Sequence, residues 1–321
     1  RKALQKEIPL ESARSTVEQV DPMPRQETTV YTAPPSDPFS WGSDLGYSQN
    51  LGGPNGFILY QFNVNLSAEY RLAPGTWIDG LLSYNFLNNY GEFSYTAPSA
   101  LPRVRTNLRE YLVTSDLVMP RLQFTHAERL QPEWYGMVYG GFLESMYAGV
   151  GGEVLYRPLR SPLAFGLNVN WVQQRDFAQD FALRDYKVMT GHFSAYLRNP
   201  LPKEVPGLLL TTSVGRYLAK DIGVTFDVAR EFTNGVRMGA WATLTNVSAA
   251  RFGEGSFDKG FYISLPFDLL TTASTQSRAN MAIQPLTRDG GARLVRSKTL
   301  YDMTDGRNLD FLHQNFEMIR N

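Results

Sequence analysis

Two residues with potentially catalytic side chains, His192 and Ser194, lie two positions apart in a segment of alternating polarity. Side chains two apart in a β-strand project from the same face, so an imidazole and a hydroxyl placed this way could act as base and nucleophile. To hydrolyse lipid, the pair would have to face lipid. The apolar neighbours Met189, Phe193 and Ala195 occupy the opposite face. We therefore predict that His192 and Ser194 are polar residues of an interior.

Other chemistry has little support in the sequence. The chain has three histidines and no cysteine, so thiolate catalysis and cysteine-based metal sites are excluded. The histidines show no metal-ligand spacing, and there is no Gly-x-Ser-x-Gly elbow or phosphate-binding loop. We predict no catalytic residue, no metal and no cofactor. The net charge of +0 gives no electrostatic case for binding nucleic acid.

These residues belong to a chain in which many segments alternate between apolar and polar residues, and one of them alternates without error. From Phe62 to Leu72 every second residue is apolar, and the residues between them are polar. A helix would mix the two sets, so this segment is a strand with one apolar and one polar face. We expect about twelve such strands, or fourteen if the tail adds two, over residues 40–50, 57–72, 76–88, 108–129, 133–143, 147–157, 162–175, 185–199, 207–218, 221–231, 235–247 and 257–268. Pro120 interrupts the segment 108–129, because proline cannot donate to a strand ladder.

Every second connection between consecutive strands is a tight turn, so all of these turns lie on the same side of the predicted sheet. They contain Pro or Asn-Gly and lie at residues 71–75, 129–133, 157–162, 198–207 and 230–235. Longer connections fall on the other side, which is the asymmetry of bacterial outer-membrane barrels. We therefore predict an all-β fold, a transmembrane up-and-down antiparallel β-barrel. The alternative is a soluble β-sandwich, whose strands would be shorter; the aromatic content of 13% favours the barrel with its aromatic girdles.

Three parts of the chain differ in composition. Residues 1–39 are interrupted by prolines and predict a periplasmic linker or arm, residues 40–268 the barrel, and residues 269–321 a periplasmic tail. In the tail, Met281–Thr287 and Ala292–Leu300 could pair as a hairpin around the turn Asp289–Gly291. Residues 307–320 have the apolar spacing of a short amphipathic helix. The chain starts with Arg1 and has no signal peptide, which we interpret as a trimmed piece of a longer protein.

The polar face of the predicted barrel carries amides, hydroxyls, charges and an indole. Such groups hydrogen-bond sugar hydroxyls or stack on sugar rings, although any polar lumen needs similar residues for its own hydrogen bonds. The candidates for glycan contact are Asn63, Asn65, Glu69, Arg71, Asp79, Asn85, Asn168, Asn170, Asp227, Arg237 and Trp241.

Three motifs in succession, Gln49–Tyr60, Lys259–Pro266 and Gln284–Gly291, resemble the C-terminal part of the YjbH/GfcD family. These outer-membrane proteins are encoded with bacterial exopolysaccharide and group 4 capsule genes. The resemblance covers about residues 40–302 and implies a role in making or exporting an extracellular polysaccharide. It also implies an upstream region of the same polypeptide. No catalytic residue comes with it.

We therefore expect a protein of the Gram-negative bacterial outer membrane that takes part in polysaccharide export. Its expected partners are the bacterial polysaccharide, periplasmic and outer-membrane export proteins, the upstream region of the polypeptide and the lipid bilayer. The polar lumen would be a conduit without bond chemistry. The alternatives are an outer-membrane lipase, protease or glycan-modifying enzyme, a plugged scaffold that docks export proteins, and a general porin.

Overall fold

The computed structural model describes residues 37–53, 56–93, 100–201, 205–232, 234–248, 252, 257–266, 278–283 and 288–305. The chain divides into two units, Arg1–Asp37 and Pro38–Asn321. Everything that follows concerns the second unit.

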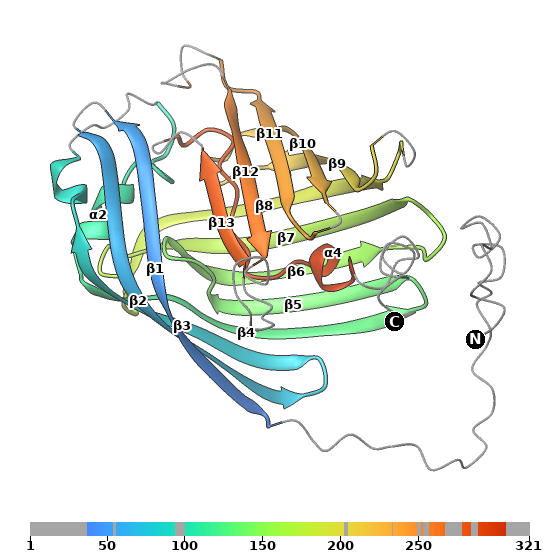
Figure 1. Ribbon diagram of the computed structural model, residues 1–321, viewed down its shortest axis with the longest axis horizontal. Helices are drawn as coiled ribbons and strands as arrows, with labels where there is room; N and C mark the ends of the chain where they lie inside the picture. The colour runs from blue at the N-terminus through green and yellow to red at the C-terminus, as the bar shows by residue number, and fades with distance from the viewer. Residues whose placement is uncertain are drawn as a thin grey trace. The chain divides into compact units, whose positions relative to one another are not determined.

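The described strands form one antiparallel sheet of 13 strands, in which each strand pairs with the next one along the chain (Figure 1). The strands are β1 Phe39–Gly53, β2 Gly56–Ala73, β3 Thr76–Asn88, β4 Leu117–Gln131, β5 Trp134–Phe142, β6 Tyr147–Tyr156, β7 Leu163–Arg175, β8 Leu183–Arg198, β9 Leu208–Arg216, β10 Ile222–Glu231, β11 Arg237–Thr245, β12 Asp258–Pro266 and β13 Arg278–Ile283. The helices are short: η1 Tyr90–Glu92, α2 Leu108–Val113 and α4 Leu300–Met303. The predicted all-β, up-and-down antiparallel architecture is confirmed.

The predicted strand boundaries agree with the observed ones to within three residues, except for the segment 108–129. There the prediction was wrong at its start, because residues 108–113 form α2 and the strand begins at Leu117. Pro120 remains inside β4. The pairing with β3 shifts register between Val118 and Arg121, so Pro120 falls in a bulge where its missing N–H leaves no gap in the ladder.

The strand count also differs from the prediction of about twelve. Arg278–Ile283 is a thirteenth strand and pairs with β12. Ala292–Leu300, expected as the second half of a hairpin, contains no strand. β1 and β13 are the two edges of the sheet, and no pairing between described residues joins them. The predicted helix at 307–320 lies outside the described residues.

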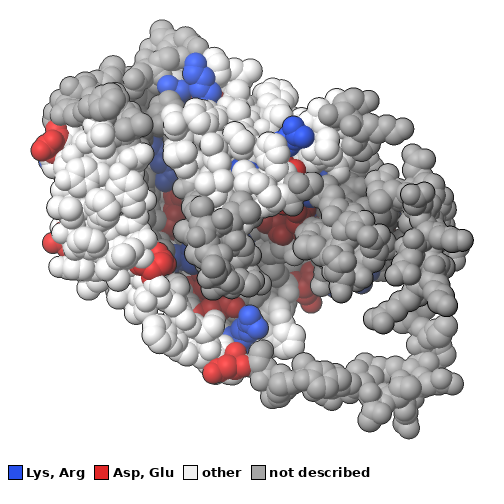
Figure 2. Space-filling model, in the orientation of Figure 1, with Lys and Arg blue, Asp and Glu red and all other residues white. Residues whose placement is uncertain are grey.

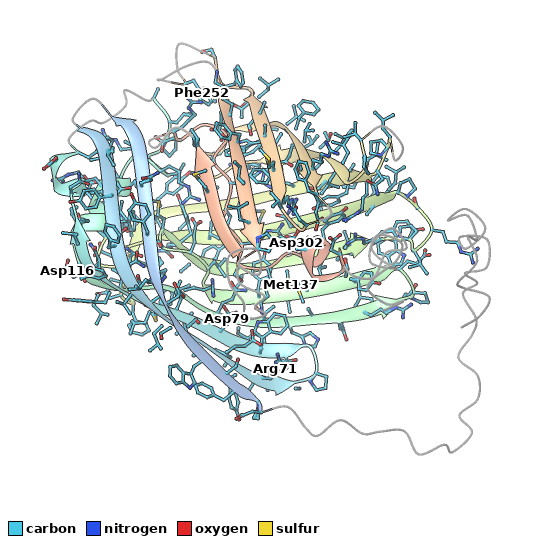
Figure 3. All side chains as sticks on the ribbon, viewed as in Figure 1. Arg71, Asp79, Asp116, Met137, Phe252 and Asp302 are labelled. Carbon is cyan, nitrogen blue, oxygen red and sulfur yellow. The ribbon has the colours of Figure 1, made fainter. Side chains whose placement is uncertain are left out.

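Along most of the described strands an apolar outer face alternates with an inner face that carries the polar side chains, as the alternation predicts. In β7 the residues from Leu163 to Val172 alternate strictly between exposed and buried, with Leu167 and Val169 exposed and Asn168 and Asn170 buried. Side chains leave the sheet on both sides (Figure 3). In Figure 2 the outer surface of β1 and β2 is almost free of charge, whereas Lys, Arg, Asp and Glu appear in the hollow beside them.

The connections divide into a short-turn side and a long-loop side. The turn Pro74–Gly75 between β2 and β3 is tight, with Gly75 at φ +74, where a Cβ atom would lie 2.3 Å from the carbonyl oxygen of Ala127. Only glycine fits that backbone approach. On the other side, the β3–β4 connection carries η1 and α2. Because β13 runs toward this long-loop side, the chain must turn back after it.

An apolar cluster lies on the inner side of the sheet and extends from the long loops to the short-turn side. Tyr111 of α2 packs there with Val104, Tyr147, Val172 and other buried side chains. Leu294, Leu300 and Tyr301 belong to the same cluster, so this stretch of the chain packs against the inner face. The sheet curves around the segment that carries α4 (Figure 1).

Candidate functional site

Residues 288–305, called the inner segment below, cross the inner face of the sheet from one end to the other. Asp289 contacts Thr106 in a long loop. Asp305 contacts Arg157 and Arg198, where β6 and β8 reach the short turns. The inner segment thus occupies the polar side of the sheet and follows the direction that a fourteenth strand would have taken.

Asp289 fixes the inner segment to the long-loop side. Its Oδ1 accepts hydrogen bonds from the backbone N–H groups of Val104, Arg105 and Thr106 at 2.8, 2.7 and 3.0 Å, and its Oδ2 accepts one from the Thr106 hydroxyl at 2.6 Å. The carboxylate is 1% exposed. Gly291 at φ +72 then completes the predicted turn. Charge-assisted bonds of this kind are about twice as strong as neutral ones.

A buried ion pair lies beside this anchor. Arg105 makes two parallel bonds to Glu144, at 2.8 and 3.1 Å, and a third to the carbonyl oxygen of Arg293 at 2.7 Å. Glu144 also accepts the N–H of Val295 at 3.0 Å. Burial alone lowers the pKa of Arg105, but the neighbouring Glu144 carboxylate outweighs it and raises that pKa above its usual value. The guanidinium therefore stays charged and holds both loop and inner segment.

Asp221, directly before β10, binds the same turn. Its Oδ2 accepts the N–H of Gly291 at 2.8 Å, and the N–H of Leu218 binds the carbonyl oxygen of Ala292 at 2.9 Å. Burial raises the pKa of the Asp221 carboxyl.

Two basic side chains, those of Arg296 and Lys298, hold the middle of the inner segment. Arg296 pairs with Glu153 of β6 at 2.6 Å, and the same carboxylate accepts the N–H of Leu300 at 3.2 Å. Lys298 pairs with Glu69 of β2 at 2.9 Å and lies 4.5 Å from the centre of the Trp77 ring. The inner segment is thereby tied to opposite parts of the sheet.

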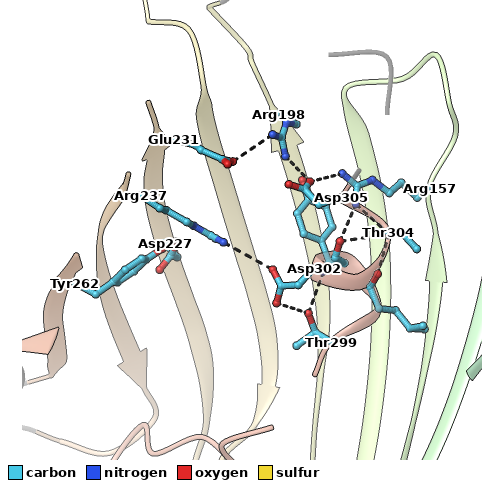
Figure 4. Close-up of polar contacts among 12 residues, drawn as sticks. Arg157, Arg198, Asp227, Glu231, Arg237, Tyr262, Thr299, Asp302, Thr304 and Asp305 are labelled. Carbon is cyan, nitrogen blue, oxygen red and sulfur yellow. Dashed lines mark hydrogen bonds and ion pairs between the residues drawn. The ribbon is translucent and has the colours of Figure 1, made fainter. Parts of the chain in front are cut away.

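The short-turn end is held by a cluster of ion pairs and rings (Figure 4). Asp305 bridges Arg157 and Arg198, and Arg198 also reaches Glu231 at 3.4 Å. The ring of Tyr301 stacks on Tyr196, with centroids 4.0 Å apart. Nearby, Asp302 lies 3.7 Å from Arg237.

The predicted glycan-contact residues fall into two groups on the inner face. Those of β2 and β3 bind one another or their neighbours: Asn63 donates to Asn65 at 2.6 Å, and Arg71 donates to Glu69 at 3.3 Å. In the same region, Asp79 pairs with Arg121, and Asn85 is buried. A role of this group in glycan contact stays a prediction.

The second group surrounds two cavities between the sheet and the inner segment. Asn168, Asn170, Asp227 and Arg237 line a cavity of about 260 Å³. Trp241 and Asp227 line another of about 300 Å³. Trp241 donates its indole N–H to Asp258 at 3.1 Å, and Asp227 accepts the Tyr262 hydroxyl at 3.2 Å. The structure thus brings these five predicted residues together, while the group on β2 and β3 contributes to neither cavity.

His192 and Ser194 are both buried on the inner face, as their parity predicts. Ser194 shares a hydrogen bond of 2.8 Å with Ser213, and His192 packs edge-on against Tyr217. No hydrogen bond of the described residues joins His192 to Ser194. That the chain is not an enzyme stays a prediction.

Glu69 and Arg237, which bind the inner segment, were predicted as site residues, whereas the other charged residues that hold it were not. Glu153, Arg157 and Arg198 lie at inward positions of strands or directly after one, so the alternation places them inside. Their partners Arg296 and Asp305 come from a tail without strand periodicity. Charged residues at inward positions were the available signal, because a buried charge requires a partner.

Within the described ranges, no helix is long and apolar enough to cross a membrane. No group of three or more His, Asp or Glu side chains in those ranges could hold a metal ion.

The fold and the site define an up-and-down β-protein with an apolar outer face and an inner face occupied by its own C-terminal segment. The YjbH family model, described as exopolysaccharide biosynthesis protein YbjH, matches residues 1–306. The chain belongs to the YjbH family. It is 46% identical over 279 residues to a protein of Escherichia coli (strain K12) named "Uncharacterized lipoprotein YjbH", a match that covers 85% of this chain and 39% of that protein. The chain therefore spans about two fifths of the length of this curated relative.

Two solved outer-membrane proteins show a distant similarity. The OmpF of Salmonella typhi, in complex with daunomycin, has a TM-score of 0.37 and 8% identity, covering 70% of this chain and 84% of that one. OmpT of Vibrio cholerae, in its trimer form, has a TM-score of 0.33 and 9% identity, covering 82% of this chain and 96% of that one. Likeness at this level carries no argument about function.

Proposed function

We propose that this chain forms the wall of a transmembrane β-barrel in the bacterial outer membrane and takes part in export or assembly of an extracellular polysaccharide. The observation that carries the membrane assignment is the outer face of the sheet. Large apolar side chains such as Leu66, Leu167 and Phe226 are about half exposed there. In water such a surface would favour aggregation, whereas in a bilayer it is the expected lipid-facing band.

Aromatic side chains on the outer face gather near both strand ends. On the short-turn side, Trp134 lies beside Tyr156 with ring centroids 4.9 Å apart, and Phe39 is opposite Tyr70 in the β1–β2 ladder. Toward the long loops, the outer face carries Phe86 and other exposed rings. Two belts of this kind match the two interfaces of a membrane. Closure of the barrel, by approach of β1 and β13, is part of this proposal.

The polysaccharide role is supported by family membership and by the chemistry of the inner face. Amides, hydroxyls and aromatic rings there suit sugar hydroxyls and rings. We expect the polymer, periplasmic export proteins and the remainder of the full-length polypeptide as partners, and no bond chemistry.

The inner segment determines whether a polymer can pass along the inner face of the sheet. The inner segment is anchored at both ends and in the middle, and it occupies the polar side of the sheet. Passage of a polymer therefore requires displacement of the inner segment. A gated conduit is therefore our first proposal. A scaffold barrel that stays plugged and docks export proteins is the second, favoured by the number of ion pairs that hold the inner segment.

The membrane and polymer assignments can be tested in the source bacterium. The chain has no cysteine, so a single introduced one gives a clean label. Phe181→Cys, in an exposed long-loop position, should react with an impermeant maleimide on whole cells, whereas Arg160→Cys in a short turn should react only after lysis. Deletion of residues 40–268 should remove polymer from the surface and trap it in the periplasm. Unchanged surface polymer would contradict the export role.

The gate can be tested with a disulfide. Leu218 and Ala292 share a backbone hydrogen bond, which places their Cα atoms within the range that a disulfide spans. With Leu218→Cys and Ala292→Cys, a gated conduit should lose surface polymer under oxidising conditions and regain it with reductant. Each single substitution is the control. Normal export by the cross-linked protein would favour the scaffold.

A further inference from the structure

The cations of the inner segment are paired with carboxylates, except one. Arg288 lies 4.0 Å from Asp258, Arg296 pairs with Glu153, and Lys298 pairs with Glu69. Arg293 has no carboxylate within 4.0 Å among the described residues, and its Nε and Nη2 are buried without a hydrogen-bond partner there. A half-buried charge without an ion-pair partner is costly, so a counterion at this position would be stabilising.

Arg293 stands where the two cavities meet. Together with Asp227 it lines both the cavity of about 260 Å³ and the one of about 300 Å³. Each is larger than the roughly 150 Å³ cavity that accommodates benzene, and together they reach the size of ordinary ligand sites. There is room for one or two sugar rings beside the guanidinium.

The wall of the first cavity offers neutral hydrogen-bonding groups. Asn168, Thr190, Thr211 and Ser213 project into it from neighbouring strands β7, β8 and β9. Amide and hydroxyl groups in such an arrangement suit the hydroxyls of a sugar, which are both donors and acceptors.

Cations outnumber carboxylates among the side chains that line the second cavity, and the carboxylate of Glu144, which pairs with Arg105, balances the difference. The cavity is lined by Arg105, Arg288 and Arg293 against Asp227 and Asp258. Arg105 is occupied by Glu144, and Arg288 lies beside Asp258. Asp227 accepts the hydroxyl of Tyr262. Among the described residues, Arg293 is therefore the lining cation without a carboxylate within 4.0 Å, and Asp227 is the lining carboxylate without a cation at that distance; Arg293 is the group that can pair with an anionic ligand.

We propose that the two cavities around Arg293 form a binding site for an acidic saccharide, a sugar that carries a carboxylate, as uronic acids do. Arg293 pairs with the carboxylate, and the amides and hydroxyls of β7 to β9 bind the sugar hydroxyls. This inference rests on the proposed polysaccharide function and names the class of polymer. Because Arg293 belongs to the inner segment, a bound acidic sugar would contact the gate itself.

The test is calorimetric titration of the full chain in detergent with tetragalacturonate and, for comparison, with neutral maltotetraose. We expect binding of the acidic tetrasaccharide, weakened by salt, and much weaker binding of the neutral one. Arg293→Gln should weaken acidic binding by about ten- to hundredfold, as expected for loss of a hydrogen bond to a charged group. Arg293→Lys should retain part of it. Arg129→Gln, which removes the same charge from an exposed position away from the cavities, is the matched control.

A second variant distinguishes a loss of binding from a loss of folding. Thr211→Met places a longer side chain in the first cavity without removing an ion pair and should also abolish binding. Equal binding of both saccharides, no binding of either, or unchanged acidic binding by Arg293→Gln and Thr211→Met would overturn the site. Each of these results leaves the polysaccharide function standing, because that function is tested separately by the surface polymer of the deletion strain.

Discussion

Glu153 of β6 and Arg296 of the inner segment, 143 residues apart in sequence, form an ion pair with 2.6 Å between Oε2 and Nη1. The side chains are 2% and 15% exposed. Because Glu153 also accepts the N–H of Leu300, one carboxylate on the sheet fixes the centre of the inner segment. This contact shows how a tail without strand periodicity is held inside the sheet.

Removal of this carboxylate should loosen the inner segment. Glu153→Leu leaves Arg296 without its partner, and breaking a buried pair from one side costs about 3–5 kcal/mol. We expect a lower melting temperature and faster proteolysis within residues 288–305. The double variant Glu153→Leu with Arg296→Leu should recover most of the loss, because no charge is then left unpaired. A double variant as unstable as the sum of the single ones would contradict this account.

Asp289 should be the most sensitive position of the long-loop anchor. Asp289→Ala leaves three backbone N–H groups and a hydroxyl without an acceptor, and each buried group left unsatisfied costs about 1–3 kcal/mol. We expect a loss of about 3 kcal/mol or more. Hydrogen exchange of the Val104 to Thr106 amides should become much faster. Unchanged protection of these amides would show that other contacts hold the loop.

The outer face should tolerate charge only near the strand ends. Leu167, in the middle of β7, and Leu163, at its first residue, point outward and are similarly exposed. Leu167→Arg should cost about 2–4 kcal/mol in a bilayer, and Leu163→Arg about 0–1 kcal/mol. The yield of folded protein in the membrane fraction measures the difference. Equal tolerance of both substitutions would argue for a water-facing surface.

Asp221 should make the stability of the protein dependent on pH. Because burial raises its pKa in the folded state, the folded protein binds the proton more tightly than the unfolded chain. The stability that protonated Asp221 contributes to the folded protein is fully present below the unfolded pKa and is lost as the pH rises through the folded pKa. Asp221→Asn should therefore stabilise the protein at neutral pH, and this gain should shrink on acidification. Unfolding in urea at several pH values tests this, with exposed Asp116→Asn as control; a gain independent of pH would contradict it.

The alternation of residue types by itself determined most of the strands and their two faces, and the short turns between them determined their order along the sheet. Side chains on a strand alternate with period two, so Asn168 and Leu167 had to face opposite sides whatever the tertiary structure. Proline and glycine marked the short turns for the same local reason, as at Gly75. His192 and Ser194 were placed inside by this parity alone.

Only the tertiary structure decided where the tail goes. Ala292–Leu300 has enough β-like residues to suggest a strand, yet it lies across the inner face, since Glu69, Glu144 and Glu153 there offer partners for its cations and N–H groups. Glu69 and Glu153 lie on strands and Glu144 in the β5–β6 connection, far from the tail in sequence, and no local pattern encodes which charges meet. The cavities around Arg293 exist for the same reason, because they are bounded by the sheet on one side and by the inner segment on the other.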